Sequence, residues 1–313
     1  MPIKVVEGLP VREKLEQERV YTITETRALT QQIRPLRILI LNLMPRKEVT
    51  ELQFLRLLGN TPLQIEIDFM YTQTYESTNT PTSHLLKYYK TYSQIKNDFY
   101  DGMIVTGAPV ETMPFEEVIY CEELKEILDW SQTHVYSRFF VCWGAQFALN
   151  YYYGIEKLLL EEKLFGVFSY ANISLHHPYL RGFDDYYNVP QSRHTTMDKV
   201  AIVEHPDIEI LSEHPKLGPD LLSSKNRRDI YAFGHLEYDR ETLADEYHRD
   251  LERGDNIQIP YNYYPDDDTS KLPIFSWKSH GYLLFNNWIN ETYQDTYYDL
   301  TKLKTRPNLS NKH

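Results

Sequence analysis

The sequence lacks the features by which secreted and membrane proteins are usually recognised. Its 313 residues include only two cysteines, Cys121 and Cys142, which are too few for a disulfide framework and fit a reducing compartment. No apolar run approaches the roughly 20 residues that span a bilayer, and the N-terminus has no apolar signal-peptide core. We therefore expect a soluble cytoplasmic protein.

Excess basic charge and phosphate-binding loops are also missing. The formal net charge of -12 argues against nucleic-acid binding, because phosphate contacts need a basic face. Residues 106–109 (TGAP) match neither a Walker nor a Rossmann loop, so nothing favours nucleotide hydrolysis or hydride transfer. The adjacent His176 and His177 have no accompanying cysteine or carboxylate cluster. We expect no bound metal and no permanently bound cofactor.

What the sequence does contain is an alternation of short apolar runs and helical patterns. The first strand is predicted at 37–43, where a continuous apolar run suits a strand buried on both faces. Further strands are predicted at 64–71, 102–106, 138–141 and 229–233, and helices at 48–58, 115–133, 145–149 and 240–253. This alternation predicts an α/β fold with helices flanking a mostly parallel sheet and ligands at the carboxyl ends of its strands.

Composition divides the chain into three parts. Residues 1–36 are polar and are expected to form an arm that packs on the main body or on a second subunit. Residues 37–300 form the main α/β domain, and the polar tail 301–313 is expected to be mobile. Within the domain, residues 171–225 are rich in proline, histidine and serine and are predicted to be loop-like, with short strands at 200–203 and 208–211.

The junction at Cys142 is the strongest local signal for chemistry. A side chain on a sharp turn from strand to helix is exposed above the sheet, and Gly144 allows a tight turn. The N-terminus of the following helix favours a thiolate, and nearby backbone amides, including that of Trp143, can receive an oxyanion. Cys121 lies within a predicted helix and is expected to pack in the core. Cys142 is therefore the candidate nucleophile.

A thiolate nucleophile needs a base, and the base needs a partner that orients it. His235 and Glu237 come directly after a predicted strand, and their spacing of two places both side chains on the same side. The pattern alone is weakly specific, but it becomes informative beside a cysteine on a turn. The sequence thus predicts a Cys142, His235 and Glu237 triad.

Longer motifs indicate a more specific protein family than the triad alone does. The pattern Cys-x-Gly-x-Gln at 142–146, with a downstream His-x-Glu, resembles class I glutamine amidotransferase-like domains, which have a flavodoxin-like fold. The chain is more specifically similar to the MetA family of homoserine O-acyltransferases, over almost its whole length to residue 300. The motifs that carry this similarity lie at 33–45, 57–64, 106–111, 142–146, 192–195 and 234–238.

The resemblance implies roles for individual residues. It makes Cys142 the acyl-thioester nucleophile, His235 the general base and Glu237 its partner. It also implies that three further residues contact substrate: Lys163, Ser192 and Arg249. Read without the family, Lys163 would be a solvated charge, and Arg249 would pair with Asp245 one helical turn earlier.

Glu111 is the position that the family uses to choose its acyl donor. Glutamate there implies acetyl-CoA, whereas glycine is associated with succinyl-CoA. A carboxylate in a narrow acyl pocket fills space and repels the free carboxylate of a succinyl group. The loop near Val110 is expected to supply a second amide for the oxyanion, beside Trp143.

The expected reaction is therefore a ping-pong transfer of acetyl from acetyl-CoA, through Cys142, to the hydroxyl of L-homoserine. Four alternatives remain: succinyl-CoA as donor, serine as acceptor, a glutamine amidase or cysteine hydrolase with the same triad, and a binding module in which Cys142 senses redox state. Homoserine and serine differ by one methylene, which pockets discriminate by only about 1–3 kcal/mol. The family also suggests a homodimer.

Overall fold

The computed structural model describes residues 3–5, 22–24, 35–59, 61–74, 80–254 and 257–305. Its N-terminal part contains β1 (Ile3–Val5) and β2 (Thr22–Thr24), which pair in parallel. Most of the predicted arm 1–36 lies outside the described residues, and so does its predicted packing on the body or on a partner. In the described residues, no helix is long and apolar enough to cross a membrane.

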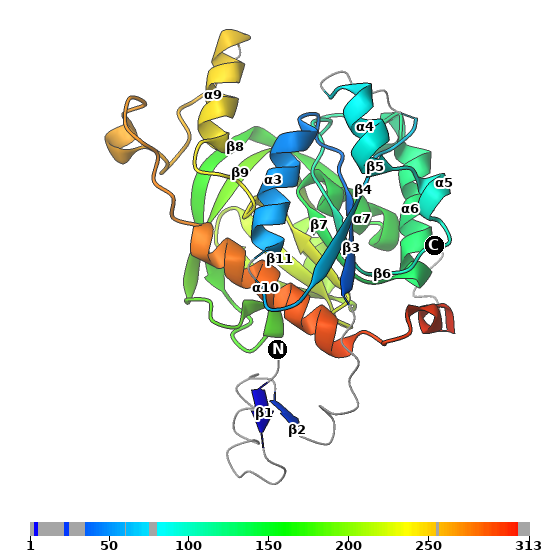
Figure 1. Ribbon diagram of the computed structural model, residues 1–313. Helices are drawn as coiled ribbons and strands as arrows, with labels where there is room; N and C mark the ends of the chain where they lie inside the picture. Colours follow the sequence, from blue (N-terminus) through cyan, green and yellow to red (C-terminus); the bar gives the residue numbers. More distant parts are fainter. Residues whose placement is uncertain are drawn as a thin grey trace.

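A ten-stranded sheet forms the centre of the structure, in the order β5-β4-β3-β6-β7-β12-β11-β10-β8-β9 (Figure 1). The first six strands in this order are parallel: β5 (Tyr89–Lys90), β4 (Ile65–Met70), β3 (Leu36–Leu41), β6 (Tyr100–Val105), β7 (Val135–Val141) and β12 (Asp229–Ala232). The remaining four are antiparallel: β11 (Gly218–Ser224), β10 (Ile208–His214), β8 (Lys157–Asn172) and β9 (Tyr186–Met197).

Helices cover both faces of the parallel part, as its continuous apolar strands require. On one face, α3 (Lys47–Leu58) and α10 (Lys278–Asp295) pack against Ile38 and Ile40. On the other face, α6 (Cys121–His134) and α7 (Trp143–Tyr153) pack with Leu39 and Leu41. Alternate residues of β3 thus enter opposite cores, because successive side chains of a strand point to opposite faces. The predicted α/β sheet flanked by helices is confirmed.

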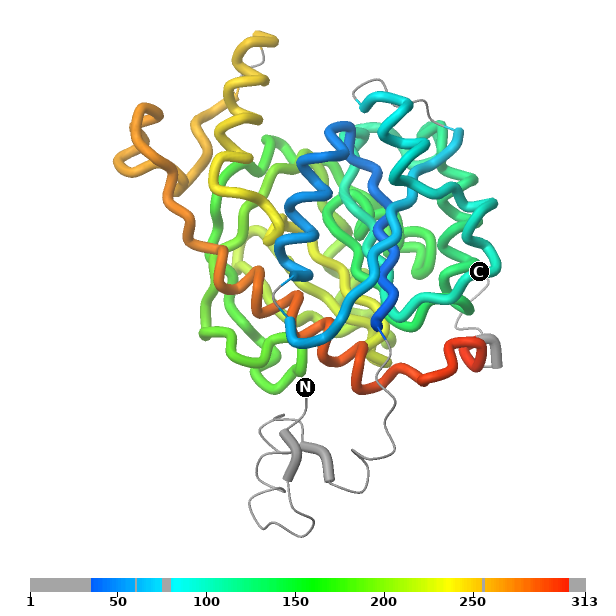
Figure 2. The backbone as a smooth tube through the Cα atoms, viewed as in Figure 1, coloured from blue at the N-terminus to red at the C-terminus, as the bar shows by residue number. Residues whose placement is uncertain are grey.

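The remaining helices lie in the connections between these elements and, in the case of the last one, after α10. They are α4 (Thr82–Tyr88), α5 (Tyr92–Ile95), η1 (Phe115–Glu117), η2 (Pro178–Leu180), α8 (Lys199–Glu204), α9 (Thr242–Glu252), η3 (Pro265–Asp267) and η4 (Leu300–Thr305). The continuous helix predicted at 115–133 is divided into η1 and α6. Leu303 of η4 is buried and η4 packs against α6, so this first part of the predicted mobile tail belongs to the folded body (Figure 2). Residues 306–313 lie outside the described residues.

Two predictions within 171–225 were wrong. The strand predicted at 200–203 is helix α8, because the side chain of Asp198 accepts hydrogen bonds from Val200 N and Ala201 N and caps a helix there. The region predicted to be loop-like contains β9 and β11 as well as the predicted strand near 208–211. The sequence analysis also assigned no helix to 278–295, which is α10.

Candidate active site

Cys142 occupies the turn between β7 and α7, where the backbone is strained. Its φ and ψ angles are 49° and −116°, a conformation that L-residues seldom adopt and that is typical of functional sites. The turn is held because Cys142 N donates a 2.7 Å hydrogen bond to Ala232 O at the end of the neighbouring strand β12. The sharp strand-to-helix turn predicted for Cys142 is confirmed.

Gly144 serves a different purpose from the one predicted, because Cys142 itself carries the positive φ of the turn. A Cβ at Gly144 would lie 2.6 Å from Thr106 O and 3.0 Å from Val105 O. Glycine therefore lets the first turn of α7 approach the backbone at the end of β6.

His235 and Glu237 lie on the turn that follows β12, the strand beside β7. His235 Nδ1 is 2.6 Å from Glu237 Oε1, and both side chains are buried. A carboxylate can only accept, so Nδ1 carries the proton and Nε2 is left for the nucleophile. Burial alone would lower the pKa of His235, but the negative charges of Glu237 and of the Cys142 thiolate raise it well above its usual value.

The strands that carry these residues are tied together below the site. Arg138 of β7 and Asp229 of β12 are register partners and form a buried bidentate ion pair, with Nε to Oδ1 at 2.6 Å and Nη2 to Oδ2 at 2.7 Å. Paired charges with two parallel hydrogen bonds fix geometry as well as energy. The cysteine and histidine turns consequently emerge at the same edge of the sheet.

Cys142 and His235 both lie next to Gly107. A Cβ placed on Gly107 would lie 3.3 Å from Cys142 Cβ and 3.7 Å from His235 Cε1. Both residues line one pocket of about 320 Å³, whereas Glu237 supports His235 from outside it. We call this space the catalytic pocket. Its lining residues are Met44, Pro45, Gly107, Ala108, Pro109, Glu111, Thr112, Cys142, Lys163, Ser192, His194, His235, Tyr238, Glu246, Arg249, Asp250 and Arg253.

Ser192 faces a carboxylate that the sequence analysis did not identify. Ser192 Oγ donates to Glu246 Oε2 at 2.6 Å, and Tyr238 OH donates to Glu246 Oε1 at 2.9 Å. The Tyr238 ring also stacks on the His235 ring, with centroids 4.1 Å apart. The signal that could have found Glu246 is its helical spacing of three from Arg249, which places both on one face of α9.

Two of the cations that line the pocket, Lys163 and Arg249, contact Asp250. Lys163 Nζ lies 3.1 Å from Asp250 Oδ2, and Arg249 Nε lies 2.8 Å from Asp250 Oδ1. Burial alone would raise the pKa of Asp250, but hydrogen bonds from Arg249 and Lys163 hold it below its usual range. The alternative pairing of Arg249 with Asp245 is not the one observed, since Asp245 lies 3.8 Å from Arg46 and Arg249 pairs with its neighbour Asp250.

Glu111 enters the same pocket from the loop after β6. Its Oε2 accepts a 2.7 Å hydrogen bond from His194 N, and its backbone oxygen accepts one from Lys157 Nζ at 2.8 Å. Burial raises the pKa of Glu111, although the hydrogen bond from His194 acts in the opposite direction. The side chain is thus held in place between the loop and β9, within the pocket that contains Cys142.

Val110 lies in the loop after β6, and its predicted contribution to the oxyanion site stays a prediction. It packs against the hydrophobic cluster that includes Trp143, whereas Gly107 and Ala108 of the same loop line the pocket. Trp143 is the first residue of α7, so its backbone amide lies at the helix N-terminus beside Cys142. Cys121 is buried at the start of α6 and packs in the second core, as predicted.

No group of three or more histidine, cysteine or acidic residues that could hold a metal ion occurs in the described part of the chain. His176 and His177 line a separate depression with Glu209 and Arg227.

Comparison with known proteins shows the family of this chain. A family model described as homoserine O-succinyltransferase matches residues 2–298. The chain belongs to this family. A homoserine O-acetyltransferase of Acetivibrio thermocellus is 50% identical over 305 residues, covering 97% of this chain and 100% of that protein. One of Streptococcus pneumoniae is 48% identical over 305 residues, covering 97% of each chain. The family resemblance of the motifs is confirmed, and the chain is an acyltransferase.

Solved structures of low sequence identity share the fold. A glutamine amidotransferase from Thermotoga maritima has a TM-score of 0.54 and 12% identity, covering 84% of this chain and 100% of that one. Another from Methylobacillus flagellatus has a TM-score of 0.51 and 11% identity, covering 83% and 95%. The predicted class I glutamine amidotransferase-like fold of this acyltransferase is thereby confirmed.

Proposed function

We propose that this acyltransferase moves an acetyl group from acetyl-CoA to the hydroxyl of L-homoserine through a thioester on Cys142. The observation that carries the proposal is the catalytic pocket, in which a strained cysteine and His235, held from outside the pocket by buried Glu237, lie beside both cationic and anionic side chains. The names of the two relatives support the same substrates.

In the first half-reaction, the Cys142 thiolate attacks the carbonyl carbon of the acyl thioester. The tetrahedral oxyanion is stabilised by the amide of Trp143 and by amides of the 107–110 loop, of which Gly107 and Ala108 line the pocket. Collapse of the intermediate breaks the bond to the CoA sulfur, and the imidazolium of His235 gives its proton to that sulfur. The acetyl group is left on Cys142 and His235 is neutral.

In the second half-reaction, neutral His235 accepts the proton of the homoserine hydroxyl as its oxygen attacks the thioester. The Cys142 thiolate leaves, and the imidazolium remains paired with Glu237. General-base assistance of this kind is typically worth about 10²–10⁴-fold in rate. The hydrogen bond that His235 Nδ1 donates to Glu237 Oε1 keeps Nε2 available for this proton.

The acceptor is proposed from the charges that surround Cys142. Arg249 lines the pocket and is proposed to bind the α-carboxylate, since its guanidinium has donors beyond the two that contact Asp250. Glu246, oriented by Ser192 and Tyr238, is positioned to bind the α-ammonium group. Lys163 adds another positive charge to the lining of the pocket, next to Asp250. A zwitterionic amino acid fits this arrangement better than water or ammonia does.

The donor is proposed from Glu111. Its carboxylate lies in the pocket with Cys142 and is fixed by the backbone of His194. A succinyl group would bring a second carboxylate toward it, which costs free energy through charge repulsion and lost space. An acetyl group has no such carboxylate, so we propose acetyl-CoA as the preferred donor.

The test is release of CoA by the purified protein, with acetyl-CoA or succinyl-CoA crossed against homoserine, serine and no acceptor. Fast release only with acetyl-CoA and homoserine, lost in Cys142→Ser and kept in the matched buried-thiol control Cys121→Ser, supports the proposal. Faster turnover with succinyl-CoA would overturn the donor, and a preference for serine would overturn the acceptor. Release that needs no acceptor would indicate a hydrolase instead.

We also propose that the enzyme works in the cytoplasm as a homodimer. Cys121 and Cys142 are both free thiols, which fits a reducing compartment, and the family resemblance suggests a dimer. Light scattering during size-exclusion chromatography tests the assembly, and a molar mass equal to the 37.3 kDa of one chain would refute it.

A further inference from the structure

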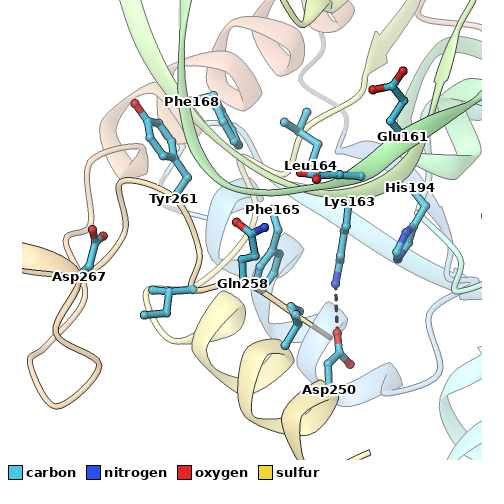
Figure 3. Close-up of a pocket in the computed structure, with 13 residues that line it drawn as sticks. Glu161, Lys163, Leu164, Phe165, Phe168, His194, Asp250, Gln258, Tyr261 and Asp267 are labelled. Carbon is cyan, nitrogen blue, oxygen red and sulfur yellow. Dashed lines mark hydrogen bonds and ion pairs between the residues drawn. The ribbon is translucent and has the colours of Figure 1, made fainter. Parts of the chain in front are cut away.

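A second pocket adjoins the catalytic pocket and is much larger. Its volume is about 930 Å³, and it shares Lys163, His194 and Asp250 with the catalytic pocket. In Figure 3, Lys163 reaches from β8 toward Asp250 on α9, and the dashed line marks their ion pair. A molecule in the second pocket therefore lies beside this pair, which also lines the catalytic pocket that contains Cys142.

The outer wall of the second pocket is built into the sheet. Tyr261 N donates to Phe165 O at 3.0 Å, and Val167 N donates to Tyr261 O at 2.8 Å, so this segment pairs with β8 across Gly166. A Cβ on Gly166 would overlap the backbone of Tyr261, and the φ of Gly166 is 139°. The Tyr261 ring also stacks on Phe168, with centroids 5.2 Å apart.

The lining of this pocket combines apolar surface with acidic charge. Leu164, Phe165, Phe168, Ile257 and Ile259 supply the apolar part, and Gln258 supplies an amide. Four carboxylates line the pocket, against a single lysine: Glu161, Glu162, Asp250 and Asp267. Such a lining repels phosphate groups, because like charges across an interface oppose binding. It suits a neutral, flexible chain that carries amides.

We propose that the second pocket holds the neutral pantetheine arm of the acyl donor, with the phosphorylated nucleotide end outside it. This inference rests on the proposed function, since it requires a CoA thioester as donor. The arm joins the thiol to the nucleotide and consists of methylene and amide groups without charge. When the arm is bound in the second pocket, its thioester end lies beyond Lys163 and Asp250, in the catalytic pocket near Cys142.

The experiment compares three donors: acetyl-CoA, S-acetylpantetheine and S-acetyl-N-acetylcysteamine, which lacks most of the arm. For the wild-type enzyme, we expect a KM for S-acetylpantetheine within about threefold of that for acetyl-CoA, and a KM at least about tenfold higher for the truncated donor, because it loses the apolar contacts. If S-acetylpantetheine is no better than the truncated donor, the nucleotide anchors the donor elsewhere and the inference is overturned.

The variant Tyr261→Ala tests whether the second pocket is the one that binds the pantetheine arm. We expect it to raise the KM for acetyl-CoA and S-acetylpantetheine by about tenfold, and to leave the KM values for the truncated donor and for homoserine unchanged. Tyr186→Ala is the matched control, since Tyr186 is 65% exposed and Tyr261 is 63% exposed, and Tyr186 does not line the pocket. Equal effects on all three donors would refute the assignment.

A binding measurement separates this inference from the proposed reaction. Calorimetry with reduced pantetheine and the Cys142→Ala protein needs no turnover, and we expect Tyr261→Ala in that background to weaken binding by about tenfold. Absence of acceptor-dependent thiol release from any donor would defeat the proposed function alone. Normal acetyl-CoA turnover together with unchanged pantetheine binding in Tyr261→Ala would defeat the subsite alone.

Discussion

Replacing Glu237 with glutamine removes a negative charge from the buried pair without removing the side chain. The pair is short, at 2.6 Å between His235 Nδ1 and Glu237 Oε1, and neither partner is solvated. Hydrogen bonds to charged groups contribute about 1.5–3 kcal/mol. If Glu237→Gln loses this amount in the transition state, where His235 becomes an imidazolium, kcat/KM for homoserine should fall by about 10- to 150-fold.

The pH dependence gives this prediction a second readout. His235 must be neutral to accept the hydroxyl proton, so the acid limb of kcat/KM for homoserine reports its pKa in the acyl-enzyme. Glu237 contributes to the raised pKa of His235. Its loss should lower that pKa and move the acid limb to lower pH, even as the plateau falls.

Steady-state kinetics across pH measure both effects, with the exposed helix residue Glu126→Gln as a charge-matched control. An acid limb that stays in place in Glu237→Gln, or that moves to higher pH, would refute the assignment of His235 as a base raised by Glu237. A fall in rate without a pH shift would assign Glu237 a purely structural role.

Three further predictions follow from the site. Because Cys142 has a φ of 49°, the free energy of unfolding of Cys142→Gly, measured by urea titration, should be about 1 kcal/mol higher than that of Cys142→Ala. Equal free energies of unfolding would show that the turn is unstrained. Because a Cβ at Gly144 would lie 2.6 Å from Thr106 O, Gly144→Ala should lower the free energy of unfolding by about 1–3 kcal/mol, measured by the same titration. Glu111→Gly should raise kcat/KM for succinyl-CoA relative to acetyl-CoA by at least about tenfold, and an unchanged ratio in CoA-release assays would remove Glu111 from donor choice.

The parallel half of the fold was predictable because its signals are local. Strands predicted at 37–43, 64–71, 102–106, 138–141 and 229–233 each overlap an observed strand. In β3, β6, β7 and β12 both faces are buried, so hydrophobicity alone marks them, whereas β4 alternates apolar and acidic residues and is mostly half-buried. The strand-to-helix turn at Cys142 could be located for the same reason, since an apolar strand and a helix meet there directly.

The antiparallel half was not predictable in this way. Strand β9 buries Gln191, Ser192, Arg193 and Thr195, which carry no hydrophobic signal. They form hydrogen bonds with one another and with distant groups: Arg193 Nε donates to Gln191 Oε1 at 2.9 Å, and Gln191 Nε2 donates to Asp220 Oδ1 at 2.7 Å. A buried polar strand is recognisable only when its partners are in place.

Local patterns and contiguous motifs were enough to predict the family, the parallel sheet and the turns that carry Cys142, His235 and Glu237. The side chains around these three residues could be known only from the folded chain. Glu246 meets Ser192 across 54 positions of sequence, and Lys163 meets Asp250 across 87. Such pairs form because β8, β9 and α9 come together around the end of the sheet, and no local pattern records which distant side chains will share a pocket.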